Sequence, residues 1–243
     1  MKKFSQSLIA LSAMLAFAVN INAQEIHIKA RFFEVPKSTL DTLQKNFEVA
    51  SDGTEMLTPE QLKGILKGLR SNSGVETFAE PEVVTTSGRR TEMRATTIQT
   101  IITNFVYQEP SDEKNGIIPQ TENVEFGPVL DVVPAVSSGN QILLNTTARL
   151  KTFLGYANPE SSAARFATNS AGQQITLPTI LPQFEVKQAS AKIAVPDGQT
   201  FLLFPKSSSE GNQNSADVEQ KFVVVMITPT LVDSAGNRIH TDN

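Results

Sequence analysis

The chain has 243 residues and a formal net charge of −4, from 21 basic and 25 acidic side chains. This acidic balance disfavours nucleic-acid binding, which requires a basic surface. The chain contains no cysteine and only two histidines, His27 and His240. This excludes disulfides and disfavours a zinc site or a nucleophile–base pair. The length suffices for one hydrophobic core or two small ones.

Residues 1–23 have the pattern of a signal peptide for export. Lys2 and Lys3 precede an apolar stretch at residues 8–19, and Ala23 offers a small residue at a cleavage point. The stretch is shorter than the roughly 20 residues of a membrane helix, so we expect removal rather than retention as an anchor. Without the two lysines the net charge becomes −6. The bacterial style of the signal predicts a place in the cell envelope, in the outer membrane or the periplasm.

Residues 24–74 are expected to form a small α+β opening segment. Residues 25–35 alternate apolar and polar side chains, which predicts a half-buried strand. A short helix follows it. Thr58 as N-cap, Pro59 and Gln61 then predict the start of a second helix with a capping box. Its apolar stripe requires a covering layer and consists of Leu62, Ile65, Leu66 and Leu69.

Residues 75–233 are expected to form a β domain, followed by a frayed polar tail at 234–243. The expected strands are 83–85, 91–107 (one long strand or a bent pair), 124–136, 141–150, 183–195, 199–204 and 220–232. Two long polar loops are expected between them, at 108–123 and 155–182.

The end of the chain carries the strongest local signals. Asp197–Gly198 between two apolar runs predicts a tight turn, because glycine reaches positive φ without steric cost. The run from Phe222 to Val232 is apolar at both alternating sets of positions. It therefore reads as a strand buried on both faces.

Residues that could carry chemistry are few. His27 lies on the polar face of the first strand, and His240 lies in the tail. Arg89–Arg90 beside the Ser87–Gly88 turn could grip an anion, although charges that blunt a strand end explain them more simply. The acids cluster in expected loops. We therefore predict no catalytic, cofactor-binding or metal-binding residue, no cofactor, and no enzyme activity.

Aromatic residues end two of the expected long strands, as Phe105 with Tyr107 and as Phe153 with Tyr156. A membrane barrel would place an aromatic girdle at such positions. Ordinary core packing is the simpler interpretation, because Thr and Asn interrupt both outer faces. Open strand edges also invite pairing, so the pattern favours assembly with further copies of the chain.

Segments in a common order resemble the secretin family, whose members form ring-shaped outer-membrane channels. The first is a helix followed by the pattern Val-x-x-x-x-x-Pro-x-Val-x-Thr and a turn. The others are a glycine before alternating Leu and Val with a proline, a Val-x-Asp-Gly-Gln-Thr turn, and a final apolar run ending Thr-Pro-x-Leu-Val. In this chain they are Gly74–Thr85 with Ser87–Gly88, Gly127–Pro134, Val195–Thr200 and Val225–Val232. Residues 28–35 are similar to the strand that leads into such domains.

The resemblance implies an α+β, mainly β fold: a secretin-like antiparallel β-sheet/barrel module preceded by the strand–helix–helix segment. It implies a homo-oligomeric ring that forms or supports an outer-membrane channel for protein secretion, with secretion-system or pilus components as partners and no nucleic acid. Residues 107–122 and 155–183 are then candidates for the gate or lumen.

Two departures from the family pattern keep an alternative open. Residues 206–219 are polar, where the family carries an apolar segment associated with the membrane-facing lip. The several periplasmic domains of large secretins also have no counterpart before residue 24. The alternative is a soluble periplasmic or surface adaptor that keeps the fold without a pore.

Overall fold

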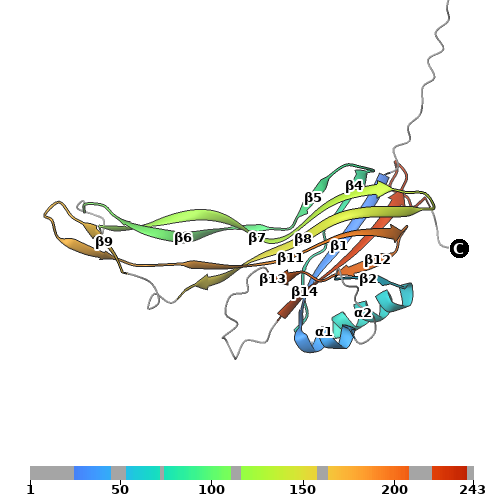
Figure 1. The fold of residues 1–243 in the computed structure, drawn as a ribbon, viewed down its shortest axis with the longest axis horizontal. Coiled ribbons are helices and arrows are strands. Elements are labelled where there is room, and N and C mark those ends of the chain that lie inside the picture. Colours follow the sequence, from blue (N-terminus) through green and yellow to red (C-terminus); the bar gives the residue numbers. More distant parts are fainter. Residues whose placement is uncertain are drawn as a thin grey trace, which may run out of the picture.

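The computed structural model describes residues 25–44, 53–71, 74–110, 116–157, 164–207 and 221–239. A body of two sheets and two helices carries a long arm of strands (Figure 1). The elements are β1 (Glu25–Pro36), α1 (Lys37–Gln44), β2 (Thr54–Leu57), α2 (Pro59–Ser71), β3 (Glu76–Ala79), β4 (Glu82–Thr86), β5 (Thr91–Arg94), β6 (Thr97–Tyr107), β7 (Ile117–Val136), β8 (Gln141–Tyr156), β9 (Arg165–Thr168), β10 (Gln174–Leu177), β11 (Pro182–Pro196), β12 (Thr200–Leu203), β13 (Lys206–Ser207) and β14 (Lys221–Val232). The expected α+β, mainly β fold with antiparallel sheets is confirmed.

The first sheet, here called the helix-side sheet, has the order β2–β12–β14–β1–β3, with β4 also paired to β1. Its centre is the antiparallel pair of β1 and β14, which runs from Glu25 opposite Val232 to Pro36 opposite Lys221. Most of β14 is buried, as its two apolar faces predicted.

Pro229 lies inside this central strand, although proline cannot donate to a sheet. The carbonyl of Pro229 accepts a hydrogen bond of 2.9 Å from the amide of Gly198, in the turn that precedes β12. In an antiparallel ladder the N–H and C=O of one residue point the same way. The backbone nitrogen of Pro229, which carries no hydrogen to donate, therefore faces the Asp197–Gly198 turn rather than a neighbouring strand. Gly198 has a φ of 77°, as this turn predicted.

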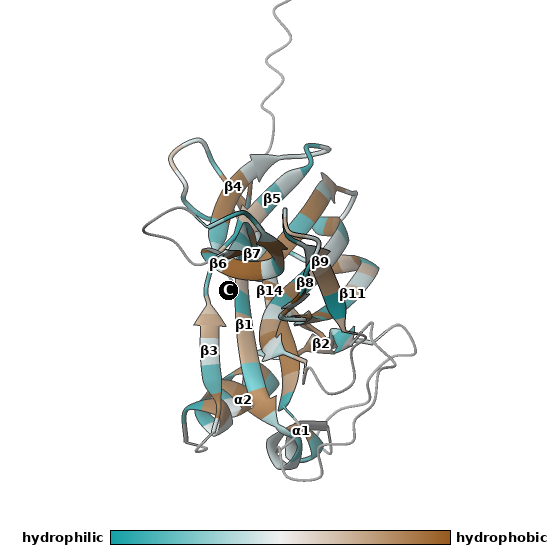
Figure 2. Cartoon of the chain, turned by 90° about the vertical axis from the view of Figure 1, so that its left-hand side faces the viewer, coloured by the Kyte–Doolittle hydropathy of each residue, from teal (hydrophilic) through white to brown (hydrophobic). Residues whose placement is uncertain are grey.

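The second sheet, here called the arm sheet, has the order β13–β11–β8–β7–β5, with β6 paired to the far half of β7. The two sheets pack face to face, and alternating apolar side chains of both fill the space between them; Figure 2 colours the apolar residues of β1 and β14 brown. The largest fully buried members of this core are Phe32, Phe201, Ile26, Ile28, Leu130, Ile142, Leu144, Leu203 and Ile227.

The helices cover one end of the other face of the helix-side sheet. The capping box of α2 is formed: Thr58 N donates to Gln61 Oε1 at 2.7 Å, and Gln61 N donates to Thr58 Oγ1 at 3.2 Å. The predicted stripe of α2 packs inward, with Ile65 and Leu69 buried. Sequence reasoning missed β2, which pairs with β12 as an edge strand.

The expectation of two long loops, at 108–123 and at 155–182, is wrong in part. β7 already begins at Ile117, and β9 and β10 form a hairpin of their own within the second segment. Both segments lie in the arm, where strands expose polar side chains on both faces for much of their length. The apolar–polar alternation of a half-buried strand is therefore absent there. The Thr91–Tyr107 segment is the bent pair of strands β5 and β6.

The residues after β14 also differ from a frayed tail. Residues 233–239 form a turn in which the carboxylate of Asp233 accepts hydrogen bonds from the amides of Ala235 and Asn237, and Arg238 bridges back to Val232. Residues 1–24 and 240–243, which include the expected signal peptide and His240, lie outside the described residues. Within the described part of the chain, no helix is long and apolar enough to cross a membrane.

Candidate assembly surface

The arm begins where β7 changes partners. Residues 117–126 of β7 pair with β6, whereas residues 127–136 pair with β8. Gly127 stands at the change, with a φ of 124°. A Cβ at this position would lie 2.7 Å from the carbonyl oxygen of Ala95, in the link between β5 and β6. Glycine is therefore required for the close approach of the two backbones.

The arm consists of two hairpins with open edges. Among the described residues, β6 pairs with β7 alone, and residues 117–126 of β7 pair with β6 alone. Residues 152–156 of β8 likewise pair only with β11. An open edge presents unpaired N–H and C=O groups that can pair with another strand. The arm thus offers several such edges outside the packed body.

An aromatic cluster joins the hairpins at the root of the arm. The ring centroids of Phe126, Phe153 and Phe184 lie 5.7–5.9 Å from one another, within the range of favourable ring contacts. Tyr156 meets Phe153 edge-on at 5.2 Å, and its hydroxyl accepts a hydrogen bond of 2.9 Å from the amide of Ile102 on β6. The ammonium of Lys151 lies 4.9 Å from the Phe184 ring centre.

The four aromatic residues singled out from the sequence therefore separate into two places. Phe153 and Tyr156 belong to this cluster, and Phe105 and Tyr107 lie half-buried on β6. Packing between the hairpins agrees with the simpler interpretation. No sequence signal groups Phe126 and Phe184 with them, because the three strands that carry the cluster are brought together only by the fold.

The hairpins also touch near the tip of the arm. The amide of Ser170, in the β9–β10 turn, donates to the carboxylate of Glu109. This hydrogen bond holds the pKa of Glu109 below its usual value. The hydroxyl of Tyr107 donates to the same carboxylate at 3.2 Å.

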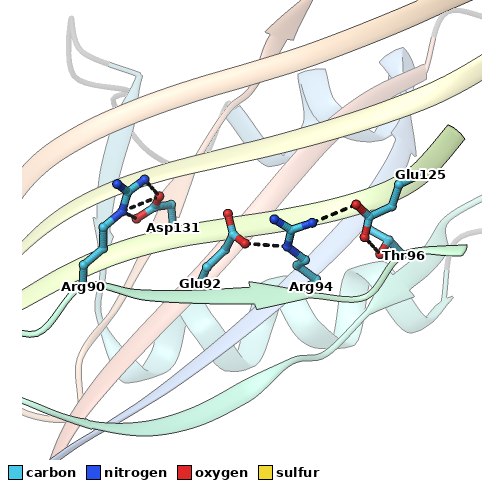
Figure 3. A network of polar contacts seen from close by, with 6 residues as sticks. All are labelled: Arg90, Glu92, Arg94, Thr96, Glu125 and Asp131. Carbon is cyan, nitrogen blue, oxygen red and sulfur yellow. Dashed lines mark hydrogen bonds and ion pairs between the residues drawn. The ribbon is translucent and has the colours of Figure 1, made fainter. Parts of the chain in front are cut away.

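A network of charges covers the exposed face of β5 and β7 beside the arm root (Figure 3). Glu92 and Asp131 face each other directly across the two strands, an arrangement that repels unless cations lie between them. The guanidinium of Arg90 binds both carboxylate oxygens of Asp131, and this lowers the pKa of Asp131 and raises that of Arg90. Arg90 therefore has an internal anion as its partner.

The network continues toward the arm through Arg94. Its guanidinium pairs with Glu92 and donates to Glu125 at 2.8 Å. The hydroxyl of Thr96 also donates to Glu125, and this bond is the main cause of the lowered pKa of Glu125. These contacts connect β5 to the first residues of the arm hairpin.

Side chains suited to binding a metal ion are not gathered in the described residues. No cluster of three or more His, Cys, Asp or Glu side chains that could hold a metal ion occurs there. His27 lies 3.6 Å from Glu82 on the neighbouring strand β4. The absence of catalytic and cofactor-binding residues remains a prediction from the sequence.

Comparison with known proteins identifies the family. Residues 68–204, more than half of the chain, match the secretin family, described as bacterial type II and III secretion system protein. The chain is a secretin. A comparison with curated proteins found no match.

Solved secretins resemble this secretin at low identity. The type II secretin GspD of enteropathogenic Escherichia coli is 12% identical, with a TM-score of 0.40, over 90% of this chain and 72% of that one. ExeD of Aeromonas hydrophila is 13% identical, with a TM-score of 0.37, over 88% and 50%. InvG of the Salmonella injectisome is 14% identical, with a TM-score of 0.35, over 90% and 63%. This secretin thus spans half of the Aeromonas protein, and the family assignment rests on the match of residues 68–204.

Proposed function

We propose that this secretin assembles into a ring of identical protomers in the bacterial outer membrane and forms or supports a channel for protein secretion. The channel acts by passive conduction and makes or breaks no bond. The observation that carries the proposal is the arm, whose hairpins extend from the body with open edges in a member of a secretion-system family.

Open edges favour pairing between protomers. A strand edge outside the body can be satisfied by a strand of the next copy, and a head-to-tail repetition of this contact closes a ring. Each arm presents different strands on its different edges, as such a head-to-tail contact requires. In the proposed ring, closure pairs the open edges of the arms.

The length of the arm supports a place in the membrane. Residues 117–126 of β7 pair along β6, which has 11 residues. At about 3.3 Å per residue such a hairpin reaches roughly 33 Å. A membrane-spanning strand needs about 9–11 residues. Each strand of the first arm hairpin therefore has the length of one membrane crossing.

We further propose the division of the chain into a signal peptide at 1–23, an opening segment at 24–74, a secretin-like β domain at 75–233 and a polar tail at 234–243. Residues 107–122 and 155–183 are the proposed gate or lumen segments. Other secretion-system or pilus components are the proposed partners; one solved relative is a complex of a secretin with a pilotin.

The experiment places a charge on the arm of the exported chain. Ile98 on β6 is 73% exposed, so Ile98→Lys is expected to change the stability of a single protomer by less than about 0.5 kcal/mol. In a ring, this side chain becomes covered by a neighbour or by lipid, where a charge is costly. Val84→Lys, at a half-exposed position on β4 in the body, is the matched control.

We expect the parent and Val84→Lys to reach the outer-membrane fraction as multimers, and Ile98→Lys to reach it at least several-fold less. If the parent remains a periplasmic monomer, the chain is the soluble adaptor instead. Equal assembly of all three proteins would show that the arm is not the assembly surface.

A further inference from the structure

The helices cover only one end of the outer face of the helix-side sheet. At the other end, β1, β12, β14 and the turn after β14 line a hollow of about 320 Å³. Leu62 of α2 lies at the border between the covered and the open end. We call this feature the cationic hollow; its polar lining consists of His27, Lys29, Arg31, Thr200, Thr228, Thr230 and Arg238.

The floor of the cationic hollow carries threonines beside the apolar side chains of Met226 and Val232. Thr200 and Thr230 are only 2% and 7% exposed, and the hydroxyls of Thr200 and Thr228 lie 2.7 Å apart. The threonines make this end of the sheet more polar than the helix-covered end, whose facing side chains are apolar. Threonine hydroxyls instead offer hydrogen bonds to a polar ligand.

The walls of the hollow carry an excess of cations. Lys29 and Arg31 have carboxylate partners, Glu82 at 3.7 Å and Glu80 at 3.2 Å, which are themselves largely exposed. Among the described residues, no carboxylate lies within ion-pair distance of Arg238 in this way. Within ion-pair distance, three permanent cations thus meet two carboxylates. The carboxylates of Asp197 and Asp233, in the turns beside the hollow, accept hydrogen bonds from backbone amides.

Arg238 lies beside the hollow, close to the backbone of Gly198. A Cβ on Gly198 would lie 2.1 Å from Nη2 of Arg238, so the guanidinium rests where only glycine leaves room. The bridge between Val232 and Arg238 fixes the chain that carries it. The guanidinium therefore lies against the turn beside the sheet.

We propose that the cationic hollow is a docking site for an acidic, extended segment of a partner protein. His27, Lys29 and Arg31 occupy alternate positions of β1 and so recur about every 7 Å. Alternate side chains of an extended peptide have the same repeat, so its carboxylates can pair with Lys29, Arg31 and Arg238 in register. Arginine binds carboxylates through two parallel hydrogen bonds, which favours this class of ligand. The inference goes beyond the channel proposal and does not depend on ring assembly.

The test uses a fluorescein-labelled peptide of four Glu-Thr repeats and the purified mature chain, with binding read by fluorescence anisotropy at low ionic strength. We expect saturable binding that weakens at least about ten-fold in Arg238→Gln, since a hydrogen bond to a charged group contributes roughly this much. Lys192→Gln removes the same charge from an exposed site on β11 and is expected to change the affinity by less than two-fold. A peptide with Lys in place of Glu should not bind.

Several results would overturn the proposal. The first is that the parent chain shows no saturable binding of the Glu-Thr peptide. The second is that Arg238→Gln binds the peptide as tightly as the parent does. The third is that Lys192→Gln loses as much affinity as Arg238→Gln, which would mean non-specific attraction. Binding of phosphatidylglycerol vesicles that Arg238→Gln abolishes, without peptide binding, would assign the hollow to a lipid headgroup. Matching thermal melts of the variants establish that each is folded.

Discussion

At the scale of single residues, a few positions determine how the arm leaves the body. Gly127 allows β7 to pass close to the link between β5 and β6, and the charge network beside it holds β5 against β7. Each of these contacts can be tested by one substitution, because the chain offers comparable positions where the same change meets no such contact.

Gly127→Ala is expected to destabilise the protein by about 1–3 kcal/mol, because φ is 124° and the new Cβ would meet a backbone oxygen. Gly68→Ala in α2 is the control; its Cβ would meet nothing within 4 Å, and alanine favours a helix. We expect it to stabilise by about 0.5–1 kcal/mol. Urea unfolding measures both changes. A loss for Gly127→Ala no larger than 0.5 kcal/mol would refute the close-approach argument.

Asp131→Asn tests the charge network through its dependence on pH. Arg90 lowers the pKa of Asp131 in the folded protein. The pair therefore contributes to stability at pH values above about 3.9, the ordinary pKa of an aspartate in the unfolded chain. That contribution disappears as the pH falls through the lowered value. We expect the variant to be less stable than the parent at pH 7, by at most about 1 kcal/mol. Thermal melts at pH 7 and below pH 3 should show the difference shrinking with acid, and a constant difference would contradict the pairing.

At the scale of elements, two packing arrangements position the surfaces discussed above. The apolar stripe of α2 closes one end of the helix-side sheet, and the aromatic cluster joins the two arm hairpins. Both act between elements distant in sequence, so a substitution in either should affect a whole element rather than one side chain.

Leu69→Ala should lower the free energy of unfolding by about 2–3 kcal/mol, because the side chain is buried between α2 and the sheet. Lys63→Ala, at an exposed position of the same helix, should change it by less than about 0.5 kcal/mol. Denaturant unfolding of the two variants separates packing from helix propensity. Equal stabilities would mean that α2 does not depend on its apolar stripe.

Phe126→Ala should loosen both arm hairpins, since Phe126 contacts Phe153 and Phe184 and is buried at the root of the arm. We expect faster hydrogen exchange in β6 and β11, and in particular at the amide of Ile102, which donates to the Tyr156 hydroxyl. Phe166→Ala, at an exposed position on β9, is the control. Exchange confined to β7 would show that the cluster does not couple the hairpins.

The elements that sequence reasoning identified best have a strong local signal. β14 was recognised because both faces are apolar, and α2 because Thr58, Pro59 and Gln61 form a capping box. The sequence predicts loops for part of the arm strands, because solvent reaches both of their faces and the apolar–polar alternation of a half-buried strand is absent. The charge network could not be predicted, since Arg90 and Asp131 are 41 residues apart and meet only through the pairing of β5 and β7.

At the scale of the whole molecule, the body and the arm have different requirements. The body buries its apolar faces between two sheets and beneath two helices. The arm has open edges, which the proposed ring would pair with strands of neighbouring copies. The family assignment agrees with this division, and a ring is the assembly that satisfies every arm alike.

The most direct measurement is the molar mass, by light scattering on a sizing column, of the mature chain extracted from membranes with a mild detergent. Ring assembly predicts one large, heat-resistant species of many protomers, recovered from the membrane pellet. A single peak at the mass of one protomer, with most of the material in the soluble fraction, would contradict it.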